Sequence, residues 1–451
     1  MPSGVWTWRL HRLRLQSPGS YLHGGGRVDA FAIRDRLVRD YADYVRSFIT
    51  VKDPRMQEYV DGVLAGGTLW PEPLIQLNPA FEPGESLQDL VADGALHAEC
   101  ERIFRIKTAA ESIGVPMQLH RHQSEAIRIA GSGRNYVLTT GTGSGKSLAY
   151  IIPIVDQVLR LGPGKGIRAI VVYPMNALAN SQVKELGKFL ELGYPEGHPP
   201  VTFARYTGQD SEERRQEILA HPPDILLTNY VMLELILTRP RDKKLIAADD
   251  DLRFLVLDEL HTYRGRQGAD VAMLVRRVRD RLSNGKLQCV GTSATLAAGG
   301  GFEEQRQKVA VVATRLLGDI VEPGCVIGET LRRATPVRSV DDLSFVSELR
   351  ACVSKPEREL PADYEAFVQD PLSSWIETTF GIAEQEGRLV PARPRSVTSS
   401  AADADQAGGS ARPGAARDLA ELTGVDEAGC TRAIERMLLA GAACEPKPGS
   451  N

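Results

Sequence analysis

The chain of 451 residues lacks several patterns that would assign it to a narrow class. No two of its six cysteines are spaced as C-x-x-C, so the sequence gives little support to a zinc or iron–sulfur site. No apolar run reaches the roughly 20 residues that a membrane-spanning helix needs. The net charge of −4 does not demand a nucleic-acid partner, although a local basic patch remains compatible with it. We therefore expect a cytoplasmic protein with reduced thiols and no membrane partner.

The length favours two or three domains, and an apolar content of 42% is enough for a packed core. Residues 1–27 carry four arginines and no acidic residue, and they lack the apolar segment of a signal peptide. We expect a disordered basic leader there, with a basic arm that touches nucleic acid as the alternative. Residues 28–114 have mostly helical apolar spacing, which predicts a helical accessory region.

Residues 115–300 alternate short β-branched runs with helical stretches. This alternation predicts an α/β domain with a parallel sheet and helices on both faces. Ligands of such domains bind at the carboxyl ends of the strands. The expected strands are 136–140, 169–173, 201–206, 224–228, 254–257 and 288–292.

The remainder of the chain gives weaker signals, and we expect a mixed, partly disordered C-terminal region. Residues 301–395 predict a mixed helical insertion. Residues 396–416 are rich in Ser, Ala, Gly and Pro, which predicts a flexible linker. Residues 417–451 contain two short helical stretches joined by a tight turn. This pair fits either a plain packing element or part of a winged-helix unit.

The most informative feature is a glycine-rich loop between an expected strand and an expected helix. Residues 139–147 read T-T-G-T-G-S-G-K-S. Backbone N–H groups of such a loop cradle phosphates, and the dipole of the following helix adds to the attraction. Lys146 is expected to reach the β- and γ-phosphates of ATP, and the Ser147 hydroxyl to ligate Mg²⁺. The other expected nucleotide contacts in the loop are Thr140, Gly141, Thr142, Gly143, Ser144 and Gly145.

An acidic element follows the apolar run 254–257. Asp258 can hold Mg²⁺, and Glu259 can position and polarise the attacking water, so both are expected to be catalytic together with Lys146. His261 completes a D-E-L-H sequence. The S-A-T sequence at 293–295 stands at the end of the next strand, where Ser and Thr can hydrogen-bond the acidic element. We expect His261, Ser293 and Thr295 to relay the state of the γ-phosphate.

Gln123 precedes the loop by one expected helix. Its amide offers both a donor and an acceptor, which suits the edge of adenine. The alternative is a plain surface glutamine.

The chain resembles superfamily 2 helicases of the DExH-box type in four features that follow in order, namely Gln123, T-G-T-G-S-G-K-S, D-E-L-H and S-A-T. This resemblance implies a RecA-like P-loop domain over 115–300. Three intervening loops look like motifs Ia, Ib and Ic of these helicases, which implies a sequence-independent grip on the sugar–phosphate backbone of one strand. Each loop alone also fits an ordinary strand-to-helix turn. The residues that the resemblance places at nucleic acid are Pro174, Asn176, Thr207, Gly208 and Thr228.

The subfamily can be narrowed further. Y-P-M-N-A-L-A-N-S-Q at 173–182 and D-E-L-H-T-Y-R-G at 258–265 resemble the YprA/MrfA group of bacterial DNA helicases. That resemblance implies 3′–5′ movement on single-stranded or duplex DNA, in DNA repair or phage defence. A grip on the backbone does not by itself distinguish DNA from RNA, so RNA stays open, as does the oligomeric state.

The resemblance also implies a second RecA-like domain, whose arginines stabilise charge on the transferring phosphoryl group. Its Q-x-x-G-R-x-G-R signature is not found, and the R-G-R-Q-G run at 264–268 lies in the same domain as Asp258. We therefore expect a truncated motor, the N-terminal part of a helicase, with feeble turnover alone. The alternative is a non-enzymatic, ATP-gated nucleic-acid-binding or interaction module that another chain completes. A GTPase is disfavoured because no N-K-x-D sequence is present.

Overall fold

The computed structural model divides the chain into two compact units, of which the first spans residues 81–330. The second unit combines the residues before 81 with those after 330. The expected leader at 1–27 and residues 399–413 of the expected linker lie outside the described residues. The structure describes residues 29–48, 51–65, 73–107, 113–141, 143–194, 199–246, 252–282, 285–294, 301–355, 357–398 and 414–444.

The first unit is built on a seven-stranded sheet with the order β13-β7-β12-β11-β8-β10-β9. Every pairing in it is parallel. The six expected strands are confirmed. The strands are β7 (Tyr136–Leu138), β8 (Ala169–Tyr173), β9 (Phe203–Arg205), β10 (Ile225–Asn229), β11 (Phe254–Leu257), β12 (Gln288–Thr292) and β13 (Val326–Ile327).

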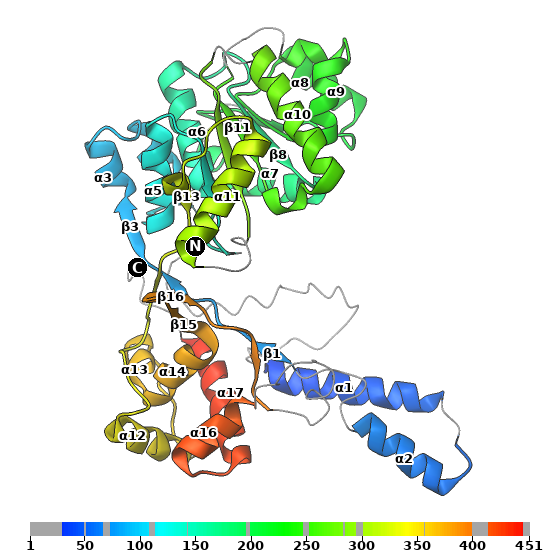
Figure 1. The fold of residues 1–451 in the computed structure, drawn as a ribbon, viewed down its shortest axis with the longest axis vertical. Coiled ribbons are helices and arrows are strands. Elements are labelled where there is room, and N and C mark those ends of the chain that lie inside the picture. The colour runs from blue at the N-terminus through cyan, green and yellow to red at the C-terminus, as the bar shows by residue number, and fades with distance from the viewer. Residues whose placement is uncertain are drawn as a thin grey trace. The chain divides into compact units, whose positions relative to one another are not determined.

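Helices cover both faces of this sheet (Figure 1). The connections from β7 to β8 and from β8 to β9 run along the sheet in one direction, and all later connections run back. Because such connections are right-handed, the two groups of helices lie on opposite faces. The first group is α6 (Leu148–Leu161) and α7 (Asn176–Leu190), and the second is α8 (Glu212–Ala220), α9 (Tyr230–Thr238), α10 (Gly265–Leu282) and α11 (Phe302–Leu317).

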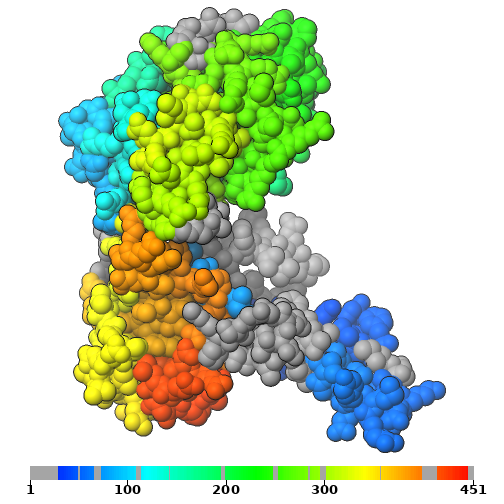
Figure 2. Space-filling view, in the orientation of Figure 1, coloured from blue at the N-terminus to red at the C-terminus, as the bar shows by residue number. Residues whose placement is uncertain are grey.

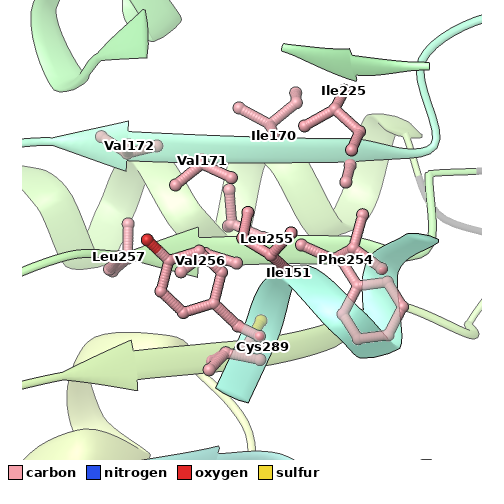
Figure 3. Close-up of a cluster of buried hydrophobic side chains, with 14 of the residues drawn as sticks. Ile151, Ile170, Val171, Val172, Ile225, Phe254, Leu255, Val256, Leu257 and Cys289 are labelled. Atoms are coloured by element: carbon pink, nitrogen blue, oxygen red, sulfur yellow. The ribbon is translucent and has the colours of Figure 1, made fainter. Parts of the chain in front are cut away.

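The core of the first unit lies between the sheet and these helices (Figure 3). Leu255 and Val256 of the central strand β11 are fully buried, as parallel strands covered on both faces require. Ile151 of α6 packs against β11 in the same cluster. On the outer surface, α11 is visible in yellow-green in Figure 2.

The first unit extends beyond the expected 115–300 domain at both ends. The two-residue strand β13 adds an unexpected edge to the sheet beside β7. At the other end, Leu90 and Phe104 are fully buried in the same core as the sheet. Burial in this core explains why residues 81–114 and 301–330 join the first unit. The added elements before residue 115 are β3 (Pro83–Ser86), α3 (Leu87–Ala92), α4 (Glu99–Ile103) and β4 (Arg105–Ile106). The expected domain itself begins with β5 (Val115–Pro116), β6 (Gln118–His120) and α5 (Arg121–Gly131).

The second unit has a separate core formed by helices that follow residue 340. Phe345, Phe367, Phe380 and Met437 are among its buried side chains. Strands far apart in the chain meet in it, since β1 pairs with β17 in antiparallel fashion. Its helices are α1 (Ala30–Ser47), α2 (Pro54–Ala65), α12 (Leu343–Val353), α13 (Tyr364–Gln369), α14 (Pro371–Ile376), α16 (Ala415–Thr423) and α17 (Glu427–Ala443). Its strands are β1 (Leu74–Ile75), β14 (Leu331–Arg332), β15 (Ile382–Gln385), β16 (Arg388–Pro391) and β17 (Arg395–Ser396), while β2 (Ala80–Phe81) crosses the boundary between the units.

The expected helical pair at the end of the chain corresponds to α16 and α17, which pack against each other. Among the helices that the structure describes, none combines the length and the apolar character needed to cross a membrane. The winged-helix interpretation stays a prediction.

Leu255→Ala should lower the free energy of unfolding of the first unit by about 3 kcal/mol, because it leaves a cavity in a fully buried strand. Met273→Ala on α10 is the matched control, since that side chain is 60% exposed. Its effect should stay within about 0.5 kcal/mol. Urea denaturation followed by circular dichroism measures both, and equal effects would contradict the assignment of β11 to the core.

Candidate functional site

Three neighbouring strands bring the predicted ATP-site residues to one edge of the sheet. The glycine-rich loop follows β7, the acidic pair follows β11, and β12 lies between these strands. Thr292 of β12 is in register with Leu138 of β7. One residue earlier, Gly291 is in register with Leu257 of β11. The parallel register therefore places the three strand ends side by side.

The glycine-rich loop adopts the conformation that its glycines allow. Gly143 has a φ of 87° and Gly145 a φ of 72°, values that an L side chain rarely adopts. The Ser144 hydroxyl lies 2.6 Å from the Thr140 hydroxyl and donates to the Gly141 carbonyl at 2.9 Å. These bonds hold the loop in a closed turn. Thr142 lies outside the described residues.

Lys146 has its ammonium group inside the site. Its side chain is 13% exposed, and Nζ lies 3.8 Å from the nearer carboxylate oxygen of Glu259. Within the described residues, Nζ is buried and has no hydrogen-bond partner. A buried ammonium group without a partner is unfavourable, so this group is available to an anionic ligand. The residues present therefore fit the phosphate groups of a nucleotide.

The acidic pair is held by Thr292, a residue that the sequence interpretation missed. The Thr292 hydroxyl donates to the Asp258 carboxylate and accepts from the Glu259 backbone N–H at 3.0 Å. Burial raises the pKa of Asp258, against the Thr292 hydrogen bond, which lowers it. A cation bound nearby would favour the charged carboxylate.

The D-E-L-H and S-A-T residues meet at the same point. His261 Nδ1 lies 3.2 Å from a Glu259 carboxylate oxygen and 3.4 Å from the Ser293 hydroxyl. The Ser293 N–H donates to the Leu138 carbonyl at 2.8 Å, which joins this segment to the strand before the loop. Thr295 lies outside the described residues. The placement of His261 and Ser293 fits the predicted coupling role, which stays a prediction.

Gln123 contacts the glycine-rich loop. Its Oε1 accepts from the His120 backbone N–H at 2.8 Å, and its Nε2 donates to the Gly145 carbonyl at 3.0 Å. A Cβ at Gly145 would come within 2.5 Å of this Nε2 atom, so only glycine allows the approach. The predicted contact of Gln123 with adenine stays a prediction.

His122 is a second residue that the sequence interpretation missed. Its side chain is buried, and Nε2 lies 2.8 Å from the Ser144 carbonyl. A protonated Nε2 donates this bond in the neutral ring. Burial lowers the pKa of His122 to about 4, although the hydrogen bond to Ser144 raises it. His122 and Gln123 therefore both tie the start of α5 to the loop.

Glu329 is a third such residue, and it comes from the segment after β13. Its Oε2 accepts from the Gly141 N–H at 2.8 Å. Because Glu329 lies 188 positions from Gly141, no local pattern points to this contact.

The loops that resemble motifs Ia, Ib and Ic lie on the other half of the sheet, after β8, β9 and β10. Asn176 begins α7, and its side-chain oxygen accepts from Asn229 Nδ2 at 2.7 Å. Asn229 in turn caps α9 by accepting from the Met232 N–H at 2.8 Å. Two helix N-termini are thus joined at this edge, and their dipoles favour anions. Pro174 precedes α7 in the same loop.

The predicted hydroxyl contacts with nucleic acid are already used within the protein. Thr207 and Thr228 are both fully buried. The Thr228 hydroxyl donates to the Tyr206 carbonyl at 2.7 Å, and the Thr207 hydroxyl donates to the Asp210 carboxylate at 2.9 Å. These hydroxyls shape the loops, and the Thr207 backbone N–H likewise donates to the Asp210 carboxylate, at 2.7 Å.

Among the described residues, protein side chains alone do not assemble a magnesium site. No group of three or more His, Cys, Asp or Glu side chains is placed to hold a metal ion in the part of the chain that the structure describes. Mg²⁺ usually binds through one or two protein oxygens and the phosphates of its substrate. Asp258, directly after β11, and Ser147, at the start of α6, are side chains of the site that fit that pattern.

The first unit combines a parallel sheet covered by helices with a glycine-rich loop and an acidic pair at one sheet edge. Residues 120–299 match the family model described as "DEAD/DEAH box helicase". This segment is a DEAD/DEAH box helicase domain, and the expected RecA-like architecture is confirmed.

Two relatives of the chain are much longer proteins. It is 32% identical over 196 residues to the "Uncharacterized ATP-dependent helicase YprA" of Bacillus subtilis, covering 43% of this chain and 25% of that protein. It is 25% identical over 346 residues to the "Druantia protein DruE" of Escherichia coli, covering 51% of this chain and 18% of that protein. The chain therefore spans a quarter or less of the length of these two relatives.

A solved structure described as "Crystal Structure of DUF1998 helicase MrfA bound to DNA and AMPPNP" aligns with a TM-score of 0.41 and 22% identity. The alignment covers 63% of this chain and 37% of that one. The sheet order and its parallel register, rather than this alignment, define the fold.

The stability of the first unit should depend on the neutral state of His122. Below pH 6.5 the unfolded chain protonates this histidine, whereas the folded protein keeps it neutral until about pH 4. Stability is therefore lost as the pH falls through this window, by up to about 3 kcal/mol. His122→Gln keeps a donor for the Ser144 carbonyl and should remove this part of the pH dependence.

Urea denaturation at pH 7.0, 6.0 and 5.0 measures the difference between the wild type and this variant. His221→Gln is the control, because His221 is exposed. Parallel pH profiles for the wild type and His122→Gln would contradict the assignment.

Proposed function

We propose that this chain carries the first motor domain of an ATP-dependent DNA helicase. The observation that carries the proposal is the buried Lys146 ammonium group without a hydrogen-bond partner among the described residues, 3.8 Å from Glu259. A positive group for phosphate and a carboxylate for water thus stand together at one edge of the sheet, after β7 and β11. This arrangement suits the transfer of a phosphoryl group to water.

The chemical roles follow from the placement of each group. Lys146 and the loop N–H groups bind the β- and γ-phosphates, while Ser147 and Asp258 hold Mg²⁺. Mg²⁺ supplies charge neutralisation at the transferring phosphoryl group when it is bound. Glu259 orients the attacking water and accepts its proton. Thr292 is a positioning residue, because its hydroxyl fixes both Asp258 and the backbone of Glu259.

The other half of the sheet is proposed to bind one strand of nucleic acid through its backbone. The joined N-termini of α7 and α9 and the loop at Gly208 present main-chain groups at the same sheet edge as the ATP site. Binding through phosphates is independent of sequence and weakens with salt. DNA is the proposed polymer, because the sequences at 173–182 and 258–265 resemble the YprA/MrfA group of bacterial DNA helicases. Movement in the 3′–5′ direction, with a role in DNA repair or phage defence, is proposed from the same resemblance.

Efficient turnover is proposed to need a second RecA-like domain. Within the described residues, the seven-stranded sheet is the single parallel sheet, and all other sheets are two-stranded. Arginines that stabilise the transferring phosphoryl group would come from that further domain. A purely non-enzymatic ATP-gated module is less favoured, because Glu259 lies 3.8 Å from Lys146 and Thr292 bonds both acidic residues.

Lys146→Ala should abolish detectable binding of Mg·ATP, because it removes the buried positive group of the site. Lys188→Ala is the matched control, since Lys188 is half exposed on α7 and pairs with Glu185. Isothermal titration calorimetry with a non-hydrolysable ATP analogue measures both variants. Unchanged affinity in Lys146→Ala would refute the proposed ATP site.

Steady-state ATP hydrolysis by this chain alone should be feeble, and single-stranded DNA should not raise it strongly, although ATP binds. Any residual turnover should fall in Glu259→Gln, which keeps the shape of the side chain but loses the carboxylate. The measurement is phosphate release with and without DNA. Strong DNA-stimulated hydrolysis by the purified monomer would contradict the need for a further domain.

A further inference from the structure

The Glu329 carboxylate binds a backbone N–H of the glycine-rich loop, which is the kind of group that such loops direct at phosphate. Its Oε2 accepts from the Gly141 N–H at 2.8 Å, and a Cβ at Gly141 would stand 3.2 Å from the same oxygen. Backbone N–H groups in such loops bind anions, and a carboxylate satisfies them as a phosphate oxygen does. Glu329 is half-buried, so little water competes for this contact.

Glu329 also adds negative charge to a site with one buried lysine. Burial raises the pKa of Glu329, against the Gly141 hydrogen bond and the charge of Lys146, which lower it. Lys146 also faces Glu259 at 3.8 Å, and its charge lowers the pKa of Asp258 against the effect of burial. Three carboxylates therefore share one ammonium group. Mg²⁺ can neutralise the negative charge of Asp258. The charge of Glu329 lies instead at the glycine-rich loop, where the phosphates are proposed to bind.

The backbone around Glu329 is fixed on both sides. The Ile327 carbonyl accepts from the Thr139 N–H at 2.8 Å, so β13 is anchored to the strand before the loop. The Thr330 carbonyl accepts from the Glu82 N–H at 2.8 Å. Only the side chain of Glu329 is free to move without breaking these bonds. Residue 330 is also the last residue of the first unit before the chain enters the second.

We infer that Glu329 is an internal competitor of the nucleotide, whose carboxylate binds the glycine-rich loop in the free protein and must be displaced by the phosphates of ATP. The inference deepens the proposed function, on which it rests. It makes Glu329 a residue that sets nucleotide affinity and that responds to nucleotide at the exit of the first unit. Since it acts on charge, its effect grows with the number of phosphates.

Glu329→Gln tests the charge, because glutamine keeps an oxygen that can accept from Gly141. The variant should bind Mg·ATP on the order of fivefold more tightly than the wild type, with a smaller gain for ADP and none for AMP. Glu329→Ala should show the same ranking of gains in affinity, largest for ATP, smaller for ADP and none for AMP. Glu322→Gln is the matched control, since it removes one charge from the same connection and its side chain is 58% exposed.

Calorimetric titration of the full chain with each nucleotide gives these affinities. Unchanged or weaker ATP binding in both Glu329 variants would overturn the inference, as would an equal gain for AMP. If the wild type binds no ATP, or Lys146→Ala binds it normally, the proposed function itself fails. The two failures are therefore distinguishable.

Hydrogen exchange provides a readout without nucleotide. In the free protein, the Gly141 amide should exchange faster in Glu329→Ala than in the wild type, whereas Glu329→Gln should retain protection. Equal exchange in all three proteins would show that the contact is absent in solution and would overturn the inference.

Discussion

The parallel register of β7, β12 and β11 is the constraint on which the site depends. β12 carries Thr292, whose hydroxyl reaches both Asp258 and the backbone of Glu259. A shift by one residue would turn this hydroxyl to the other face of the sheet. Helices packed closely on both faces of the sheet hold these strands in place. The buried aliphatic strands therefore fix the geometry of the candidate site.

The sequence predicted the parts of this site that depend on local order. Short β-branched runs that alternate with helical stretches predicted six of the seven strands, and the glycines after β7 and the two carboxylates after β11 indicated the site. The sequence could not predict β13, because two residues give no periodicity, and it missed Glu329 for the same reason. His122 was overlooked because a histidine on a buried helix face has no distinctive spacing. Its role comes from the Ser144 carbonyl, which only the fold brings near.

The division into units was harder to predict than the strands. β1 at Leu74–Ile75 pairs with β17 at Arg395–Ser396, so the second unit combines both ends of the chain. Local patterns show helices and turns, but they do not show which core a helix will join. Leu90 resembles any apolar helical residue, yet it is fully buried with the sheet of the first unit. Packing between distant segments, rather than propensity, set the boundary at residue 81.

Strand β8, next to the central strand β11, gives the two halves of the sheet a direct hydrogen-bonded connection. Its Val172 carbonyl accepts from the Asp258 N–H at 2.9 Å, and the loop that follows it carries Pro174 and Asn176. Asn176 is bonded in turn to Asn229, at the end of β10. The acidic pair and the proposed nucleic-acid loops are therefore joined through one hydrogen-bonded strand. They also share one sheet edge, so the shortest bonded path between them runs within the sheet itself.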